Sequence, residues 1–180
     1  MIRKGLGWGV LVGSLFAVPL TALLYLADQL ADLPFVPFEL FNWLVRVLPG
    51  DLITIGIDTM ISLFLALGVD LANAKLAEQS MAVLQFVGLL VVVTVVYFLI
   101  SGRRTTGPPS WGQGVVLGAL VGLPMAGITL SLTQSSMVPT VSLIYIIAVF
   151  LIWGVLTNWA YTKTMPITTQ TAEEKRTVAP

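Results

Sequence analysis

The feature that most constrains this chain is a set of four long segments that contain no charged residue. They cover residues 6–27, 81–100, 112–132 and 138–161. An α-helix needs about 20 apolar residues to cross the hydrocarbon core of a bilayer, which is roughly 30 Å thick. A helix also satisfies its own backbone hydrogen bonds inside that core. The sequence therefore predicts an all-α integral membrane protein with four transmembrane helices.

The composition agrees with this class and excludes several others. Hydrophobic residues make up 57% of the 180 residues and charged residues only 10%, whereas charged residues make up roughly 25% of soluble domains. The formal net charge is zero, so there is no electrostatic basis for binding nucleic acid. The chain has no Cys and no His. Because thiolates and imidazoles are the usual ligands of redox centres and zinc, we expect no cofactor or metal to be bound by its own side chains.

Residues 28–80 form a long insert between the first two apolar segments. Residues 33–44 are rich in aromatic residues and proline, which is typical of a chain at a membrane interface. The turn at residues 49–51 predicts Asp51 as the N-cap of an apolar helix over residues 52–69. We expect the insert to be an interfacial or re-entrant helical element. The alternative is that residues 52–69 form a fifth span.

The first and third apolar segments follow one pattern. Residues 7–19 and 112–124 align without a gap on G-x-G-V-x-x-G-x-L-x-small-x-P, and a basic pair precedes each. The pattern predicts two helical hairpins related by a parallel internal repeat. Small residues at every fourth position give each helix a smooth face, where another backbone can approach closely. The predicted helix-packing residues are Gly5, Gly9, Gly13, Gly114, Gly118 and Gly122.

The distribution of basic residues predicts the orientation. If residues 52–69 do not cross, seven of the nine Lys and Arg lie on the side of both termini, and if they cross the best split is six to three. The positive-inside rule favours the first topology. We therefore expect residues 1–161 to form one multi-pass domain in the bacterial cytoplasmic (inner) membrane, with both termini cytoplasmic. Residues 162–180 are polar and predict a disordered cytoplasmic tail.

Four side chains in the insert are candidates for function or docking. Phe38 and Trp43 are aromatic residues that an interfacial segment can present to a partner. Asp58 is the single carboxylate within residues 52–69, and a carboxylate at the bilayer centre costs about 2.5–3.5 kcal/mol and is often functional. The charge distribution favours the other interpretation, in which Asp58 lies at the interface and faces water or pairs with Arg46.

Two stretches of the insert resemble a known family. They read LPFVPFELFNWLVRVLPG at residues 33–50 and AKLAEQSMA at residues 74–82. Both resemble the N-terminal membrane region that precedes the catalytic domain in some bacterial molybdopterin-dependent oxidoreductases of the sulfite-oxidase type. The resemblance covers mainly residues 33–83, includes no catalytic residue, and comes without a pterin-binding domain. It implies a membrane anchor or subunit that serves an oxidoreductase encoded elsewhere.

These observations lead to one expected function and two alternatives. The expected function is a non-catalytic membrane subunit or anchor that binds the lipid bilayer and docks a redox partner protein, or forms a homo-oligomer. The first alternative is a small transporter or channel built from two parallel hairpins. It needs a polar path at mid-membrane, for which Asp58, Gln85 and a few hydroxyls such as Thr94 are available. A membrane enzyme ranks third, because the spans lack His, Cys and clustered acids.

Overall fold

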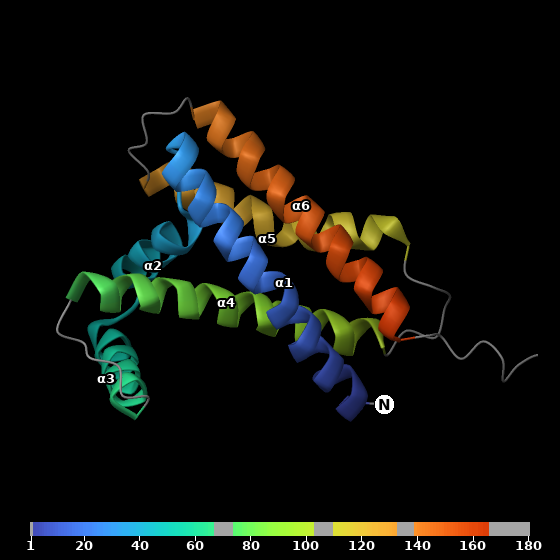
Figure 1. Cartoon of the computed structure of the whole chain (residues 1–180), viewed down its shortest axis with the longest axis horizontal. Coiled ribbons are helices and arrows are strands. Elements are labelled where there is room, and N and C mark those ends of the chain that lie inside the picture. The colour runs from blue at the N-terminus through green and yellow to red at the C-terminus, as the bar shows by residue number, and fades with distance from the viewer. Residues whose placement is uncertain (1, 67–73, 103–109, 133–138, 166–180) are drawn as a thin grey trace, which may run out of the picture.

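The structure, a computed structural model, describes residues 2–66, 74–102, 110–132 and 139–165 of the chain. These residues form six α-helices and no strand (Figure 1). Two of the helices are short and four are long. In chain order they are α1 (Ile2–Ala31), α2 (Val36–Val47), α3 (Gly50–Ala66), α4 (Ala74–Ser101), α5 (Trp111–Leu132) and α6 (Pro139–Thr164).

Four of the described helices are long and apolar enough to cross a membrane, which confirms the predicted all-α membrane class. The candidate spans are Gly5–Ala31, Gln79–Ser101, Trp111–Leu132 and Pro139–Thr164. α3 has 17 residues within the described part of the chain. At 1.5 Å per residue it is about 26 Å long, which is shorter than a hydrocarbon core of roughly 30 Å.

Several predicted boundaries differ from those of the structure. α1 continues to Ala31 and α4 begins at Ala74, so both ends of the predicted insert belong to long helices. α6 continues past residue 161 to Thr164, and the rest of the predicted tail, residues 166–180, lies outside the described residues. The apolar-run criterion ends a helix at its first polar residues, although backbone hydrogen bonding continues through them.

The predicted N-cap at Asp51 is wrong, because α3 begins earlier, at Gly50. The amides of Leu52 and Ile53 donate to the Pro49 carbonyl oxygen at 3.0 and 3.3 Å, so the first turn is already closed at that point. Asp51 lies in this first turn, where a negative charge interacts favourably with the helix dipole. The predicted end of this helix, at residues 67–69, lies outside the described residues.

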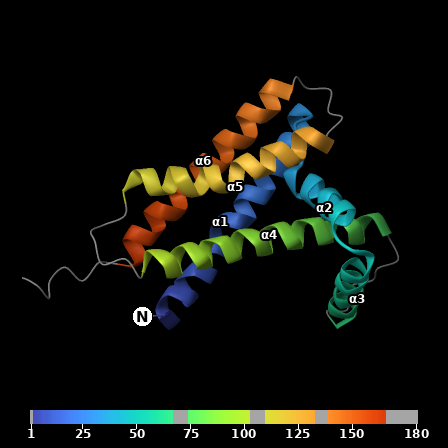
Figure 2. The same cartoon turned by 180° about the vertical axis from the view of Figure 1, so that it is seen from behind.

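The long helices form two antiparallel pairs. α1 packs along α4, and α5 packs along α6, and these are the two most extensive helix–helix contacts of the described structure (Figures 1 and 2). On one side of the bundle α1 also contacts α6 and joins the pairs directly. On the other side α2 joins the pairs, because it contacts both α4 and α5.

The bundle has two different ends. The N-terminal end of α1 and the C-terminal end of α6 lie together, at the right of Figure 1, and we call this the proximal end. The opposite, distal end holds α2, α3, the C-terminal end of α1 and the N-terminal end of α4 (Figures 1 and 2). A chain that crosses a membrane an even number of times has both ends on the same side of it. The two ends of the described chain lie at the same end of the bundle, as four spans require.

The core extends through both helix pairs and includes α2. Phe86 of α4 and Phe150 of α6 meet edge to face with their ring centroids 6.2 Å apart, and Trp153 lies 6.5 Å from Phe150. Val36 and Leu40 of α2 are buried in the same cluster. Within the insert that was predicted to be interfacial or re-entrant and helical, residues 36–47 form a helix packed on the bundle. Its proline lies in the first turn, where no backbone N–H is needed.

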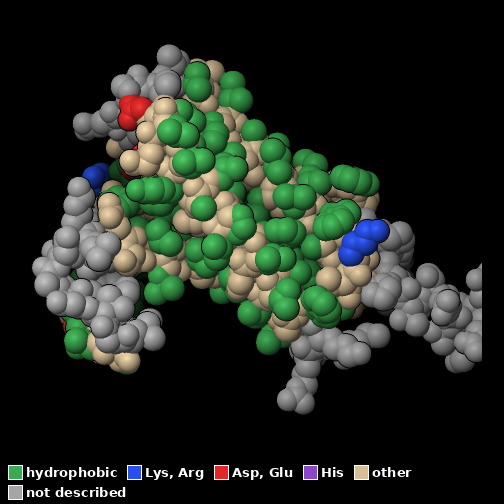
Figure 3. Space-filling view, viewed as in Figure 1, with side chains coloured by type: hydrophobic (Ala, Val, Ile, Leu, Met, Phe, Trp, Pro, Cys, Tyr) green, Lys and Arg blue, Asp and Glu red, His purple; other side chains and the backbone are tan. Residues whose placement is uncertain are grey.

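The outer surface of the bundle is apolar. Figure 3 shows hydrophobic side chains over most of one face, with the charged side chains of the described residues only at the two ends. Large aliphatic side chains in the middle of each span are more than half exposed, namely Leu15 (60%), Val92 (59%), Leu120 (69%) and Ile152 (60%). A soluble protein rarely exposes so large an apolar surface, so this belt is the lipid-facing surface.

A polar contact joins the pairs near the proximal end. The Tyr97 hydroxyl of α4 donates to Oδ1 of Asn158 on α6 at 2.5 Å. The Nδ2 atom of Asn158 donates in turn to the carbonyl oxygen of Ser110, just before α5, at 3.3 Å. One buried amide therefore links three of the four long helices, in the apolar region where interhelical hydrogen bonds contribute to helix association.

Candidate functional site

Gly9 and Gly13 place the backbone of α1 directly against α4. A Cβ added at Gly9 would lie 2.9 Å from the Val95 Cα, and one added at Gly13 would lie 3.0 Å from the Val91 Cα. Carbon atoms in van der Waals contact are separated by about 3.5–4.0 Å. α1 and α4 would therefore have to move apart to accept even an alanine at either position.

Gly114 and Gly118 occupy the same place between α5 and α6. An added Cβ would lie 2.9 Å from the Val155 Cα at Gly114 and 2.7 Å from the Leu151 Cα at Gly118. Gly154 faces them from α6, where an added Cβ would lie 2.7 Å from the Gly118 Cα. Gly154 was not among the predicted helix-packing residues, although a glycine inside an apolar segment indicates close helix packing.

The remaining two predicted packing glycines differ from each other. At Gly122 an added Cβ would lie 2.8 Å from the Phe150 Cβ, so the tight contact of α5 with α6 continues to this level. At Gly5 the nearest atom would be the terminal methyl carbon of Met165, at 3.5 Å. Gly5 therefore makes an ordinary contact with a flexible side chain and marks the loose, proximal end of the α1 stripe.

The two helix pairs pack in the same register. Val95, opposite Gly9, and Val155, opposite Gly114, are 60 positions apart, and the two glycines are 105 positions apart. The next contact, at Gly13 and Gly118, repeats both offsets. Burial along the second helix of each pair also repeats at 60 positions. The corresponding buried residues are Ala82, Phe86, Leu90, Phe98 and Ser101 on α4, and Ser142, Ile146, Phe150, Asn158 and Tyr161 on α6.

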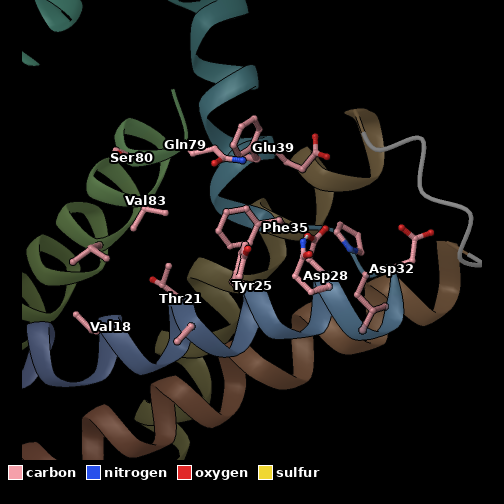
Figure 4. A pocket seen from close by; sticks show the side chains of 16 residues that line it. Val18, Thr21, Tyr25, Asp28, Asp32, Phe35, Glu39, Gln79, Ser80 and Val83 are labelled. Atoms are coloured by element: carbon pink, nitrogen blue, oxygen red, sulfur yellow. Dashed lines mark hydrogen bonds between the residues drawn. The ribbon is translucent and has the colours of Figure 1, made fainter. Parts of the chain in front are cut away.

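A pocket of about 1010 Å³ opens at the distal end between α1, α2 and α4 (Figure 4). The lining changes in polarity along its length. In Figure 4, Val18 and Val83 lie toward one end, whereas Asp28, Asp32 and Glu39 lie toward the other. The pocket therefore combines an apolar inner part between two membrane spans with an acidic mouth at the end of the bundle.

Three aromatic rings form one wall of this distal pocket. Tyr25 of α1 meets Phe35 edge to face with their ring centroids 5.8 Å apart. Phe38 of α2 follows, at 6.3 Å from Phe35 and tilted against it. Phe38, a predicted docking residue, is thus part of a pocket wall. The ring stack connects α1 to the start of α2 across the sharp turn between them, where Asp32 has a positive φ of 50°.

The mouth of the pocket is acidic, and among the side chains that the structure describes no Lys or Arg lines the pocket. The Asp28 carboxylate accepts a hydrogen bond of 2.7 Å from the side-chain amide of the neighbouring Gln29. Asp28 and Glu39 are half-buried. Among the described residues, no three acidic side chains lie close enough together to hold a metal ion.

The other three predicted docking residues do not line the pocket. Trp43 is half-buried and packs against the main core, and Arg46 is exposed in the last turn of α2. Asp58 is exposed on α3. The structure therefore brings only Phe38, of the four candidates, to the pocket.

α3 is amphipathic, although its composition is almost wholly apolar. The hydroxyls of Thr54, Thr59 and Ser62 each donate to the carbonyl oxygen four residues earlier, at 3.0, 2.7 and 2.8 Å. The polar side chains of α3 are these three hydroxyls and the carboxylates of Asp51 and Asp58. α3 packs extensively on no other described helix.

Comparison with known proteins identified no relative: no protein-family model, curated protein or solved structure matches this chain.

Proposed function

We propose that this chain is a non-catalytic integral membrane subunit or anchor that docks a redox partner, of the molybdopterin-dependent oxidoreductase type, at its distal end. The proposal is carried by the location of the residues that resemble the membrane region of such oxidoreductases. The described part of residues 33–83 forms α2, α3 and the first turns of α4, and these elements gather at the distal end (Figures 1 and 2). A single surface therefore presents this segment.

The bundle has the features of a rigid scaffold. The α1–α4 and α5–α6 contacts bring backbones together through glycine, and small-residue contacts of this kind drive helix association in lipid. Its buried polar side chains within the described residues are all uncharged. They are Thr21, Thr94, Ser101, Thr129, Ser142, Thr157 and Asn158.

This distribution favours an anchor over a transporter or channel. Ionisable residues inside a bundle are the usual mark of an ion or proton pathway. Asp58, the carboxylate on which the transporter hypothesis depends, is exposed on α3 and not enclosed by the four spans.

We also propose that the distal end faces away from the cytoplasm of a bacterial cell. Seven of the nine basic residues belong to segments at the proximal end in the four-span topology, whereas six acidic residues lie on the described segments of the distal end. Cytoplasmic loops carry the excess of Lys and Arg. The docking surface then lies on the outer face of the inner membrane.

We propose in addition that the two helix pairs arose by duplication, with α2 and α3 inserted into the first copy. The glycines of α1 and α5 are separated by a constant 105 positions, and the residues that they contact on α4 and α6 by a constant 60 positions. These constant offsets support duplication, because unrelated helix pairs would not share one packing register. α2 also occupies the gap between α4 and α5. If the two hairpins were arranged symmetrically, α5 would contact α4 directly at this place, as α1 contacts α6 on the other side.

The docking proposal is tested by purifying the tagged protein from its native membrane in mild detergent. Co-purifying proteins are identified by mass spectrometry, and the molybdenum content of the eluate is measured. A stoichiometric molybdenum-containing partner supports the proposal. A homo-oligomer without molybdenum or another protein overturns it.

A matched pair of charge reversals locates the docking surface. Arg46 and Lys163 are both exposed basic residues in the last turn of a helix, α2 at the distal end and α6 at the proximal end. We expect Arg46→Glu to lower the amount of co-purified partner several-fold, and Lys163→Glu to leave it unchanged. Equal losses in both variants would contradict a distal docking surface.

A further inference from the structure

The distal pocket is elongated along the axis of α1. Its lining on α1 runs from Val18 to Asp32, a rise of about 21 Å at 1.5 Å per residue. The antiparallel helix α4 lines part of the same length, from Val87 back to Gln79. This length accommodates a polar head together with a large part of a hydrocarbon chain.

The inner part of the pocket offers only apolar surface. Val18 and Ala22 of α1 face Val83 and Val87 of α4 across it. Thr21 is the one hydroxyl at this level, and it donates to the Ala17 carbonyl oxygen at 2.8 Å. Because that donor is already used, a small polar ligand has no reason to enter, whereas a hydrocarbon chain buries apolar surface there.

The mouth is suited to an organic cation. The carboxylates of Asp28 and Glu39 lie at the mouth beside the aromatic wall that contains Tyr25 and Phe35. Carboxylates attract a cation by charge, and aromatic faces attract an ammonium group through the ring quadrupole. The described lining contains no Lys or Arg, so none of the described side chains offers a positive charge to an anionic head.

We propose that the distal pocket binds an amphiphile with an ammonium head and an apolar chain. The head lies at the mouth, between the carboxylates and the aromatic wall, and the chain lies between α1 and α4. A membrane phospholipid with an ammonium headgroup and a free long-chain amine share this chemistry. This site is separate from the proposed docking of a protein partner, and neither Arg46 nor Lys163 lines it.

The test uses the full chain in neutral maltoside micelles. The probes are a nitroxide-labelled alkyltrimethylammonium and an alkyl sulfate of the same chain length, and the motionally restricted fraction is titrated by electron paramagnetic resonance. We expect tight binding of the cationic probe and none of the sulfate. Asp28→Asn and Glu39→Gln each remove a charge without changing size, and each should weaken binding about twofold to fivefold, as for partly exposed ion pairs.

Asp58→Asn is the matched control, because it removes the same charge from α3 at the same end of the molecule, outside the pocket. It should leave the affinity unchanged. Equal binding of the two probes, or equal weakening by Asp58→Asn, overturns the proposal. Size-exclusion profiles and helix content show that each variant is folded before its affinity is compared.

Lipid analysis of the protein purified from its native membrane separates the two sources. A retained lipid with an ammonium headgroup that is lost in the Asp28→Asn, Glu39→Gln double variant identifies a membrane phospholipid. Binding of the cationic probe without a retained lipid identifies a free amphiphile. Retention of the same lipid by the wild type and the double variant overturns the assignment of the head to the carboxylates.

Discussion

At the scale of single residues, close packing depends on which face of a helix each glycine occupies. An added Cβ at Gly118 would lie 2.5 Å from the Phe150 carbonyl oxygen and 2.7 Å from the Leu151 Cα, whereas one at Gly127 on the same helix would meet nothing within 4 Å. Gly118 is buried and Gly127 is exposed. The same substitution at the two positions therefore separates packing from helix propensity.

We expect Gly118→Ala to lower the free energy of unfolding by about 1–3 kcal/mol, the usual effect of overpacking a tight contact. Gly127→Ala should be neutral or stabilising by up to about 1 kcal/mol, because alanine has the higher helix propensity. The measurement is reversible unfolding by sodium dodecyl sulfate in mixed micelles, followed by loss of helix content. Equal effects of the two variants would show that α5 and α6 are not in backbone contact.

At the scale of elements, the sequence was most informative where one physical requirement dominates. The length and apolarity of the four long segments predicted the spans, and the spacing of Gly9, Gly13, Gly114 and Gly118 identified residues that lie in the closest helix contacts. No sequence signal gave their partners on α4 and α6, because the partner depends on the register of one helix along the other.

The distal pocket could not be predicted for the same reason. Tyr25 and Asp28 fall at the end of an apolar segment, where they are ordinary interfacial residues. They become part of a pocket only because antiparallel packing brings Gln79 and Val83 of α4 beside them and the turn after α1 brings in Phe35. The insert was predicted to be helical, but the bounds of α2 were not, because its aromatic residues and prolines are also typical of a segment at the membrane interface.

Whether α3 lies in the membrane interface or crosses the bilayer can be tested directly. Asp51, Thr54, Asp58 and Ser62 are spaced three or four residues apart and so share one face. The rest of α3 is almost entirely apolar, and the helix runs across the axis of α4 at the distal end (Figure 1). A helix of this kind lies in the plane of the interface, with its apolar face in the acyl layer.

The chain has no native Cys, so single cysteines can be placed along α3 without a background. In membranes, we expect a water-soluble maleimide to react rapidly with the variants Thr54→Cys and Asp58→Cys, and slowly with Ile53→Cys and Ile57→Cys. The reaction rate should thus follow the helical period. Uniform protection of all four positions would indicate a transmembrane helix, and uniform reactivity would indicate a helix in water.

At the scale of the whole molecule, the structure divides into an end with the two ends of the described chain and an end with α2, α3 and the pocket. The spans between them present aliphatic side chains to lipid and bury only uncharged polar groups within the described residues. Any specific interaction with a charged or polar partner therefore takes place at an end. The orientation of the chain in the membrane then decides which compartment such a partner occupies.

Gly50, at the distal end, and Lys163, at the proximal end, are both exposed and suit a test of this orientation. In the proposed orientation, the excess of basic residues in the proximal segments retains that end in the cytoplasm. In spheroplasts, a membrane-impermeant maleimide should label Gly50→Cys at once, and Lys163→Cys only after lysis. The reverse pattern would invert the orientation. Labelling of both before lysis would show that α3 crosses the membrane, because a fifth span places residues 50 and 163 on one side.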